Sequence, residues 1–226
     1  GAYYADYTGI MSVGWNADKY GDISSLDDLL DPKFAGTVAL NGKPAEAGAA
    51  FNGYLMANQL AGGDINNLQP GLDYFKKLKE AGNLTTVDVT NGTIDSGQTG
   101  VVFDWTYNQA SYKKELKDKG VNWKYKTFPK AQVVSYYNQA INKDAPHPAA
   151  ARLWEEYLYT ADAQNLWFKG GANPVLLDSM KEDGTVDQAT LKDAITIEGE
   201  PVSYTNDDST RITEWLQNNW DKTIGN

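Results

Sequence analysis

The stretch GVVFDWTYN, residues 100–108, decides which fold we expect for this chain. Its apolar run, 101–103, lies between a glycine and an aspartate, which is typical of a short strand buried on both faces. A second strand is expected at 133–141, where apolar and polar residues alternate. Helix-compatible runs at 44–60 and 67–81 precede both strands, with apolar residues spaced by three and four. This alternation of helices and strands predicts an α/β fold on a largely parallel or mixed sheet.

Further elements are expected on either side of this region. Hydroxyls followed by acidic residues at 24–30 are typical of a capped short helix, and a strand follows at 37–40. Later helices are expected at 148–158, 161–168 and 209–222. The first of these begins at a proline, which a helix tolerates in its first turn.

The composition limits the possible classes of protein. With 226 residues, the chain is long enough for about one and a half average domains, so one large or two small lobes are expected. It carries 20 basic and 30 acidic residues, and only Arg152 and Arg211 among the basic ones are arginines. This balance argues against a nucleic-acid partner, because phosphate recognition favours guanidinium groups. The absence of cysteine excludes disulfides, thiolate zinc sites and cysteine nucleophiles.

Residues with catalytic potential are few. The one histidine, His147, lies between two prolines at an expected helix start, which favours a surface turn residue over a base or metal ligand. The sequence contains no nucleophile elbow, phosphate-binding loop or clustered metal ligands, so no catalytic residue, metal or cofactor is predicted. A hydrolase that uses paired carboxylates stays open, because 30 acidic residues offer many pairs.

Aromatic residues beside polar groups form a candidate ligand site at 104–108. In open α/β sheets, ligands bind beyond the carboxyl ends of the strands, where these residues would lie. Trp105 and Tyr107 beside the carboxylate of Asp104 suit a cationic or sugar-like ligand, through stacking, cation–π contact and charge-assisted hydrogen bonds. The alternative is that these rings cap the edge of the hydrophobic core.

The segment 41–49 leads into the helix expected at 44–60 and contains Gly48. The first N–H groups of a helix have no partner within it and form a possible anion site. Glu46 argues against an anion, because a carboxylate in the first turn stabilises the helix and repels negative charge. A ligand contact and a plain helix start therefore both stay open.

Four blocks of sequence follow one another along the chain: YTGIMSVGWN at 7–16, SLDDLLDPKFAGTVAL at 25–40, the strand and helix at 140–158, and WFKGGANP at 167–174. In this order they resemble family 1 of the extracellular solute-binding proteins of bacterial ABC importers, in the iron, polyamine, thiamine and phosphonate branch. The resemblance implies a periplasmic-binding-protein-like type II fold. Two α/β lobes with mixed sheets and flanking helices would close on a solute in the cleft between them.

The resemblance also implies a domain organisation. Residues 8–130 with 205–226 would form the second, C-terminal lobe, and 131–204 would be the C-terminal part of the first lobe. Members of the family begin with a signal peptide and further first-lobe residues, so this chain is expected to lack the N-terminal part of that lobe. The apolar surface that such a truncation exposes favours domain swapping or an oligomer.

Only some of the solute-site residues of the family have a match in this sequence. Trp105 matches a cleft tryptophan of the polyamine binders, with Asp104 and Tyr107 on either side. On the return strand, Ser135 and Tyr137 stand where those binders have an aromatic residue and an aspartate. A ferric-iron or phosphonate binder is the alternative within the family, although the adjacent tyrosines and the hydroxyls that such members use are missing here.

The leading hypothesis is a non-enzymatic solute-binding subunit that captures a small cationic or amine-containing solute, such as a polyamine, and delivers it to a membrane permease. Its location would be periplasmic or extracellular, with a lipid anchor in a Gram-positive organism. Two alternatives remain, the carboxylate-pair hydrolase and a sensor domain of the same fold. The candidate ligand-binding residues are Asp104, Trp105, Tyr107, Glu46, Gly48 and Tyr137.

Overall fold

The computed structural model describes residues 3–197 and 200–225 and divides the chain into two compact units. Unit 1 consists of Gly1–Ile10 and Val134–Thr196, and unit 2 consists of Met11–Val133 and Ile197–Asn226. The assignment of these units to a C-terminal lobe and to part of a first lobe stays a prediction.

The secondary structure alternates between helices and strands, as the sequence predicts. The strands are β1 (Tyr4–Asn16), β2 (Val38–Leu40), β3 (Val101–Trp105), β4 (Trp123–Lys126), β5 (Val134–Gln139) and β6 (Asn173–Pro174). The helices of unit 2 are α1 (Ala17–Tyr20), α2 (Gly48–Leu60), α3 (Gln69–Glu80), α4 (Asn91–Asp95), α5 (Thr106–Lys117) and α10 (Asn206–Thr223). Those of unit 1 are α6 (Pro148–Leu158), α7 (Ala161–Lys169), α8 (Leu177–Glu182) and α9 (Gln188–Asp193). Short 3₁₀ turns occur at Asp27–Leu30, Pro32–Phe34 and Pro129–Ala131.

The sheet of unit 2 has the strand order β2-β3-β1-β4. β2 and β3 are parallel, with Leu40 opposite Phe103, whereas β1 is antiparallel to β3 and to β4. The sheet is therefore mixed, as expected for the fold class. Because parallel neighbours end at the same edge of a sheet, the residues that follow β2 and β3 lie together.

β3 is buried along its whole length, which confirms the prediction from its apolar run. Phe103 belongs to the main core of unit 2, which also contains Tyr54, Phe75 and Ile212 from the helices that cover that face. Val102 belongs instead to a smaller cluster on the other face, completed by Ile94, Leu116 and Trp123. The two-residue period of a strand produces this division.

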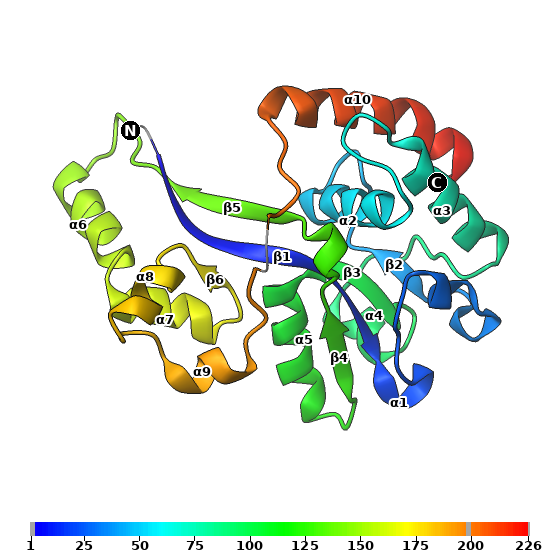
Figure 1. Cartoon of the computed structure of the whole chain (residues 1–226), viewed down its shortest axis with the longest axis horizontal. Coiled ribbons are helices and arrows are strands. Elements are labelled where there is room, and N and C mark those ends of the chain that lie inside the picture. The colour runs from blue at the N-terminus through cyan, green and yellow to red at the C-terminus, as the bar shows by residue number, and fades with distance from the viewer. Residues whose placement is uncertain (1–2, 198–199, 226) are drawn as a thin grey trace. The chain divides into compact units, whose positions relative to one another are not determined.

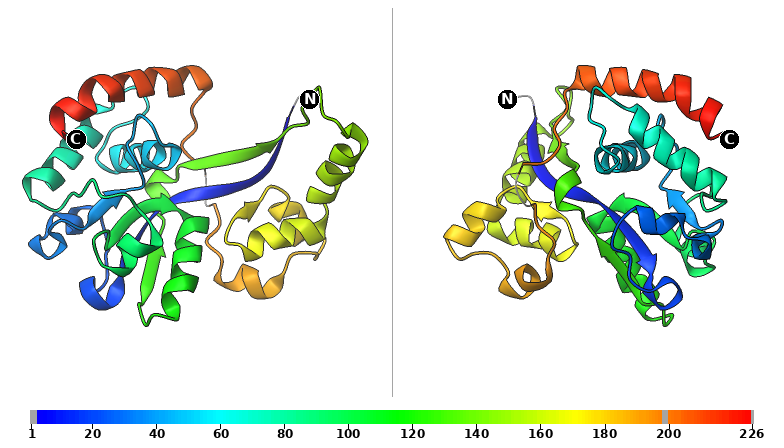
Figure 2. Two further views of the ribbon diagram at one scale, coloured as in Figure 1. Left: turned by 180° about the vertical axis from the view of Figure 1, so that it is seen from behind. Right: turned by 45° about the vertical axis from the view of Figure 1, so that its right-hand side comes forward.

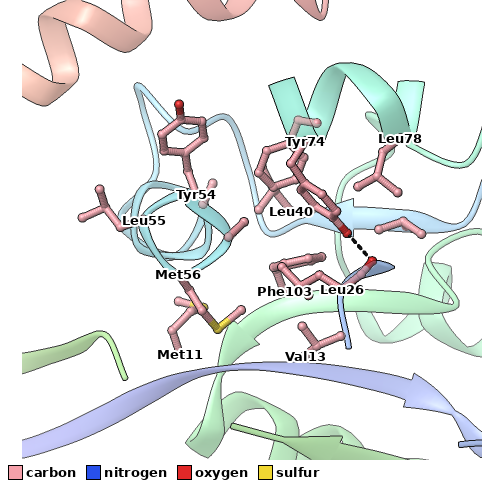
Figure 3. Close-up of a cluster of buried hydrophobic side chains, with 14 of the residues drawn as sticks. Met11, Val13, Leu26, Leu40, Tyr54, Leu55, Met56, Tyr74, Leu78 and Phe103 are labelled. Carbon is pink, nitrogen blue, oxygen red and sulfur yellow. Dashed lines mark hydrogen bonds between the residues drawn. The ribbon is translucent and has the colours of Figure 1, made fainter. Parts of the chain in front are cut away.

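Helix α2 packs closely on the sheet of unit 2. A Cβ atom at Gly53 would lie 3.0 Å from Leu40 Cδ2 and 3.3 Å from Phe103 Cβ, so a larger residue there would require these neighbours to shift by a few tenths of an ångström. Figure 3 shows the packed side chains, together with the hydrogen bond that the Tyr74 hydroxyl donates to the Leu26 carbonyl. The long helix α10 lies over α2 and α3 (Figures 1 and 2).

Unit 1 is built on the first half of β1. This segment pairs antiparallel with β5, from Tyr4 opposite Gln139 to Ile10 opposite Val134, and also with the short strand β6. The buried members of its apolar cluster are Phe168, Leu177, Met180 and Val186.

Several helix boundaries differ from those predicted, and α10 begins at Asn206 instead of 209. The helix expected from Pro44 begins at Gly48, because 44–46 form a turn in which the Lys43 carbonyl accepts the N–H groups of Glu46 and Ala47. The short helix expected at 24–30 is a 3₁₀ turn at Asp27–Leu30. There the Asp28 carboxylate accepts the N–H groups of the two serines before it. No helix in the described residues is long and apolar enough to cross a membrane.

Candidate functional site

The carboxyl ends of β2 and β3 form one edge of unit 2, and we call residues 41–48 and 104–108 at this edge the β2–β3 edge. It contains five of the six candidate residues. The side-chain amide of Asn41, directly after β2, donates to Asp104 Oδ2 at 2.8 Å, at the end of β3. This hydrogen bond joins the two segments of the edge.

Asp104 organises the edge from within. Its carboxylate is fully buried and accepts hydrogen bonds from the Asn41 amide (2.8 Å), the Asn108 amide (2.9 Å), the Tyr112 hydroxyl (2.9 Å) and the Trp105 N–H (2.7 Å). Burial raises the pKa of this carboxyl above its ordinary value, although the four donors act in the opposite direction. The carboxylate is thus occupied by the protein's own donors, and it positions the residues around it.

The two rings of the edge lie nearly parallel. The centroids of Trp105 and Tyr107 are 6.3 Å apart, with 15° between the planes. Trp105 is only 5% exposed and belongs to the core of unit 2, whereas Tyr107 is half-buried. Of the two, Tyr107 has the larger surface for contact with a solute.

The start of α2 is the open part of the edge. Its N-cap, Ala47, has no side chain that can accept a hydrogen bond. Gly48, the first helical residue, is exposed, and a Cβ atom built on it would meet nothing within 4 Å. Glu46 is also exposed, but it lies in the preceding turn and not in the first turn of the helix. A ligand can therefore approach the first backbone N–H groups of α2 closely.

Tyr137, the sixth candidate, lies on β5 in unit 1 and is 41% exposed. Its ring stacks on Tyr7 of β1, with centroids 4.7 Å apart and planes 9° from parallel. Tyr7 also stacks on Trp167 of α7, at 4.5 Å and 27°. Tyr137 is thus the outer ring of a column of three.

A buried carboxylate holds this column in place. Asp6 Oδ1 accepts from Trp167 Nε1 at 3.1 Å and from Gln164 Nε2 at 3.3 Å, and Oδ2 accepts from Gln139 Nε2 at 2.9 Å. Burial raises the pKa of the Asp6 carboxyl above its ordinary value. The two units thus each contain a buried aspartate beside aromatic rings.

Several of these residues were not among the sequence candidates. Asn41 could have been found as the polar residue that directly follows a buried strand next to β3. The block at 7–16 included Tyr7, but nothing in the pattern joined it to Trp167, which is 160 residues further along the chain. Nothing in the sequence indicated Tyr112, because its contact with Asp104 depends on the turn of helix α5 that carries it back towards the end of β3.

The described residues contain no group of three or more histidine, cysteine, aspartate or glutamate side chains placed to hold a metal ion. His147 is exposed and serves as the N-cap residue of α6, without a side-chain capping bond. This agrees with its interpretation as a surface turn residue.

A family model described as bacterial extracellular solute-binding protein matches residues 1–194. The chain belongs to this family. Its fold, an α/β structure with a mixed sheet flanked by helices, is that of the type II periplasmic binding proteins, as the sequence predicts. The match shows a bacterial extracellular solute-binding protein, and no curated protein matches the chain.

Solved structures with this fold are named for different solutes. The periplasmic binding protein AfuA from Actinobacillus pleuropneumoniae, with fructose-6-phosphate bound, has a TM-score of 0.67 and 19% identity over 99% of this chain and 69% of its own. The spermidine/putrescine-binding PotD from Streptococcus pneumoniae has a TM-score of 0.68 and 14% identity, over 98% of this chain and 69% of its own. Iron-bound HitA from Pseudomonas aeruginosa has a TM-score of 0.64 and 20% identity, over 96% of this chain and 69% of its own. At these identities the likeness shows the fold and leaves the solute open.

Proposed function

We propose that this protein binds its solute at the β2–β3 edge without chemical turnover, and that the solute carries an anionic group such as a phosphate or sulfate. The observation that carries the proposal is the start of α2, where exposed Gly48 follows an N-cap without a capping side chain. A helix N-terminus of this kind presents backbone donors and a positive partial charge to an anion.

The other features of the edge support an anionic group. The one carboxylate at the end of β3, Asp104, is buried and accepts four hydrogen bonds, so it offers no surface to a cation. Helix α5 also starts at this edge with an N-cap, Trp105, that makes no side-chain capping bond. Half-buried Tyr107 then supplies a ring for the uncharged part of the solute.

A pair of substitutions at Gly48 tests the role of the backbone. Gly48→Pro removes the N–H at the first helical position, where proline is tolerated, and Ala47 already has the extended backbone that a following proline requires (φ −118°, ψ 130°). Gly48→Ala keeps the N–H and adds a methyl group in open space. Only the proline variant should lose anion affinity, by at least about tenfold.

Binding is measured by calorimetry and thermal shift with fructose 6-phosphate, inorganic phosphate and sulfate. Equal affinity of the proline and alanine variants would show that the anion is not held at α2. Failure of every anion to stabilise the wild-type chain would contradict the anionic solute altogether.

The amine-containing solute remains the second candidate, and the exposed carboxylate of Glu46 beside the start of α2 favours it. Glu46→Gln separates the two candidates. The substitution should raise the affinity for an anion, because it removes a repulsive charge, and should lower the affinity for spermidine or putrescine. Proline at position 48 should leave amine binding unchanged.

The remaining parts of the function follow from the family. We propose a periplasmic or extracellular location and delivery of the solute to a membrane permease. Closure around the solute and the shift of population that it brings stay predictions. A panel of the same solutes incubated with the protein should be recovered chemically unchanged, whereas appearance of a hydrolysis product would favour the carboxylate-pair enzyme.

A further inference from the structure

Unit 2 contains a cavity that is separate from the β2–β3 edge. Its volume is about 540 Å³, within the range of small-molecule sites. One wall is the face of α3 that carries Pro70, Asp73, Tyr74 and Lys77, spaced by three and four residues. Another wall is the C-terminal end of α2 with its C-cap residue, from Ala57 to Ala61, so the cavity lies about 13–20 Å along α2 from Gly48.

The cavity has an apolar floor. Leu26, Ala57, Tyr74 and Phe128 line it and are buried in the core of unit 2. The exposed parts of Leu26, Tyr74 and Phe128, 6–7% of each residue, form the apolar surface that a ligand can contact.

Hydrogen bonds hold the walls in place. The Tyr74 hydroxyl donates to the Leu26 carbonyl at 2.9 Å, which fixes the 24–27 segment to α3 (Figure 3). Asp28 Oδ2 accepts the N–H groups of Ser24 and Ser25 at 2.6 and 3.0 Å, and Lys126 Nζ donates to the Ser24 carbonyl at 3.0 Å. The cavity is therefore formed before any ligand binds.

Charges of both signs lie around the cavity. Asp27, Asp73 and Lys77 are exposed, and in the described part of the chain none of them takes part in an ion pair. The side-chain amide of Gln69 donates to Asp73 Oδ1 at 2.8 Å and so orients this carboxylate. Two carboxylates and one ammonium group thus surround an apolar floor.

We propose that this cavity is a second binding site, for a small zwitterion with an apolar side chain, of the class of the apolar amino acids. The ammonium group of the ligand would pair with Asp73 and Asp27, its carboxylate with Lys77, and its side chain would contact Tyr74 and Phe128. This site is independent of the solute site at the β2–β3 edge.

Ligand-observed NMR with the wild-type chain and three probes tests the chemistry. L-Phenylalanine offers both charges and an apolar group, phenethylamine lacks the carboxylate, and 3-phenylpropionate lacks the amine. Phenylalanine should bind most tightly and phenylpropionate most weakly. Binding of none of the three, or equal binding of all three, would overturn the proposal.

Three variants locate the site. Lys77→Gln and Asp73→Asn should each weaken phenylalanine binding by about tenfold, and Ala61→Phe should abolish it by filling the cavity from an exposed position. Lys76→Gln and Glu80→Gln are matched controls on the same helix, because these two residues pair with each other and do not line the cavity. Loss of binding in the control variants, or retention in all three test variants, would place the ligand elsewhere. Anion binding at Gly48, measured on the same variants, should not change.

Discussion

At the scale of single residues, Asp104 links the segments that follow β2 and β3. Asn41 comes from one segment and Asn108 and Tyr112 from the other, and all three donate to this one buried carboxylate. A carboxylate accepts several hydrogen bonds at once, whereas an asparagine at the same position would itself present a donor. The residue type at position 104 therefore matters for the shape of the whole edge.

Asp104→Asn should destabilise the protein at neutral pH by about 1–3 kcal/mol, because at least one buried donor loses its acceptor. Urea unfolding of the variant and the wild type measures this difference. Asp88→Asn, at an exposed position, is the control and should change stability little. An unchanged stability of the Asp104 variant would mean that the three donors find other acceptors.

The pH dependence of this difference follows from the raised pKa of Asp104. An unfolded aspartate titrates near 3.8 and the folded one at a higher pH, so between these values the folded state binds more protons. The contribution of Asp104 to wild-type stability is therefore complete at acidic pH and falls as the pH rises through the folded pKa. The stability gap between the wild type and Asp104→Asn should narrow as the pH rises from 3.8 through the folded pKa of Asp104. A gap that widens would contradict the raised pKa.

At the scale of elements, the N-terminus of helix α10 is stabilised by side-chain capping, which can be tested by mutation. Thr205 and Asp208 form a capping box, in which the Thr205 Oγ1 accepts the N–H of Asp208 and Asp208 Oδ2 accepts the N–H of Thr205. These bonds and Arg211 lower the pKa of Asp208 to about 2. The stabilisation is present above pH 3.8 and is lost as the pH falls towards 2.

Thr205→Ala should lower the free energy of unfolding by about 1 kcal/mol at neutral pH, since it removes the capping hydroxyl. Thr210→Ala is a matched control inside the same helix, where the hydroxyl bonds only the carbonyl of Asn206 and alanine is the better helix former. Thermal unfolding compares the two variants. An equal loss of stability in both variants would mean that the capping hydroxyl of Thr205 does not stabilise the protein more than an ordinary hydroxyl within the helix.

At the scale of the whole molecule, the two units have cores of different size. The main core of unit 2 draws on β1, β2, β3, α2, α3 and α10, whereas the buried cluster of unit 1 contains Phe168, Leu177, Met180 and Val186. On α6 in unit 1, Leu153 and Trp154 remain 72% and 60% exposed. Association of the chain through apolar surface stays a prediction.

Hydrogen exchange should reflect this difference between the cores. Amides of β3 should be protected close to the global free energy of unfolding, because all five residues of that strand are buried. Amides of α7 and β5 should exchange faster, through local opening of unit 1. Mass spectrometry of peptic fragments measures both, and equal protection would show that the two units unfold as one.

The sequence alone was sufficient to predict the fold class. The apolar run 101–103 and the helical spacing of apolar residues at 67–81 show which residues of a strand and a helix must be buried, however these elements pack. It also indicated the family, through blocks spread along the chain, and placed Trp105 and Tyr107 at the end of a strand. The actual start of α2 was missed, because alanine-rich residues 44–47 are compatible with a helix and only the turn closed by Lys43 excludes it. Strand β4 and helix α5 were missed as well, because lysines hide their apolar pattern.

Tertiary structure decided what the site residues do. Asp104 looked like a cation partner in the sequence, and its burial among donors from α5 and from the end of β2 makes it a positioning residue. Tyr137 stacks on Tyr7, which in turn stacks on Trp167, and this column forms only when β1, β5 and α7 come together. The physical reason is that periodicity depends on neighbours along the chain, whereas burial and hydrogen bonding of a polar group also depend on residues far away in the sequence, such as Asn41 for Asp104 and Trp167 for Asp6.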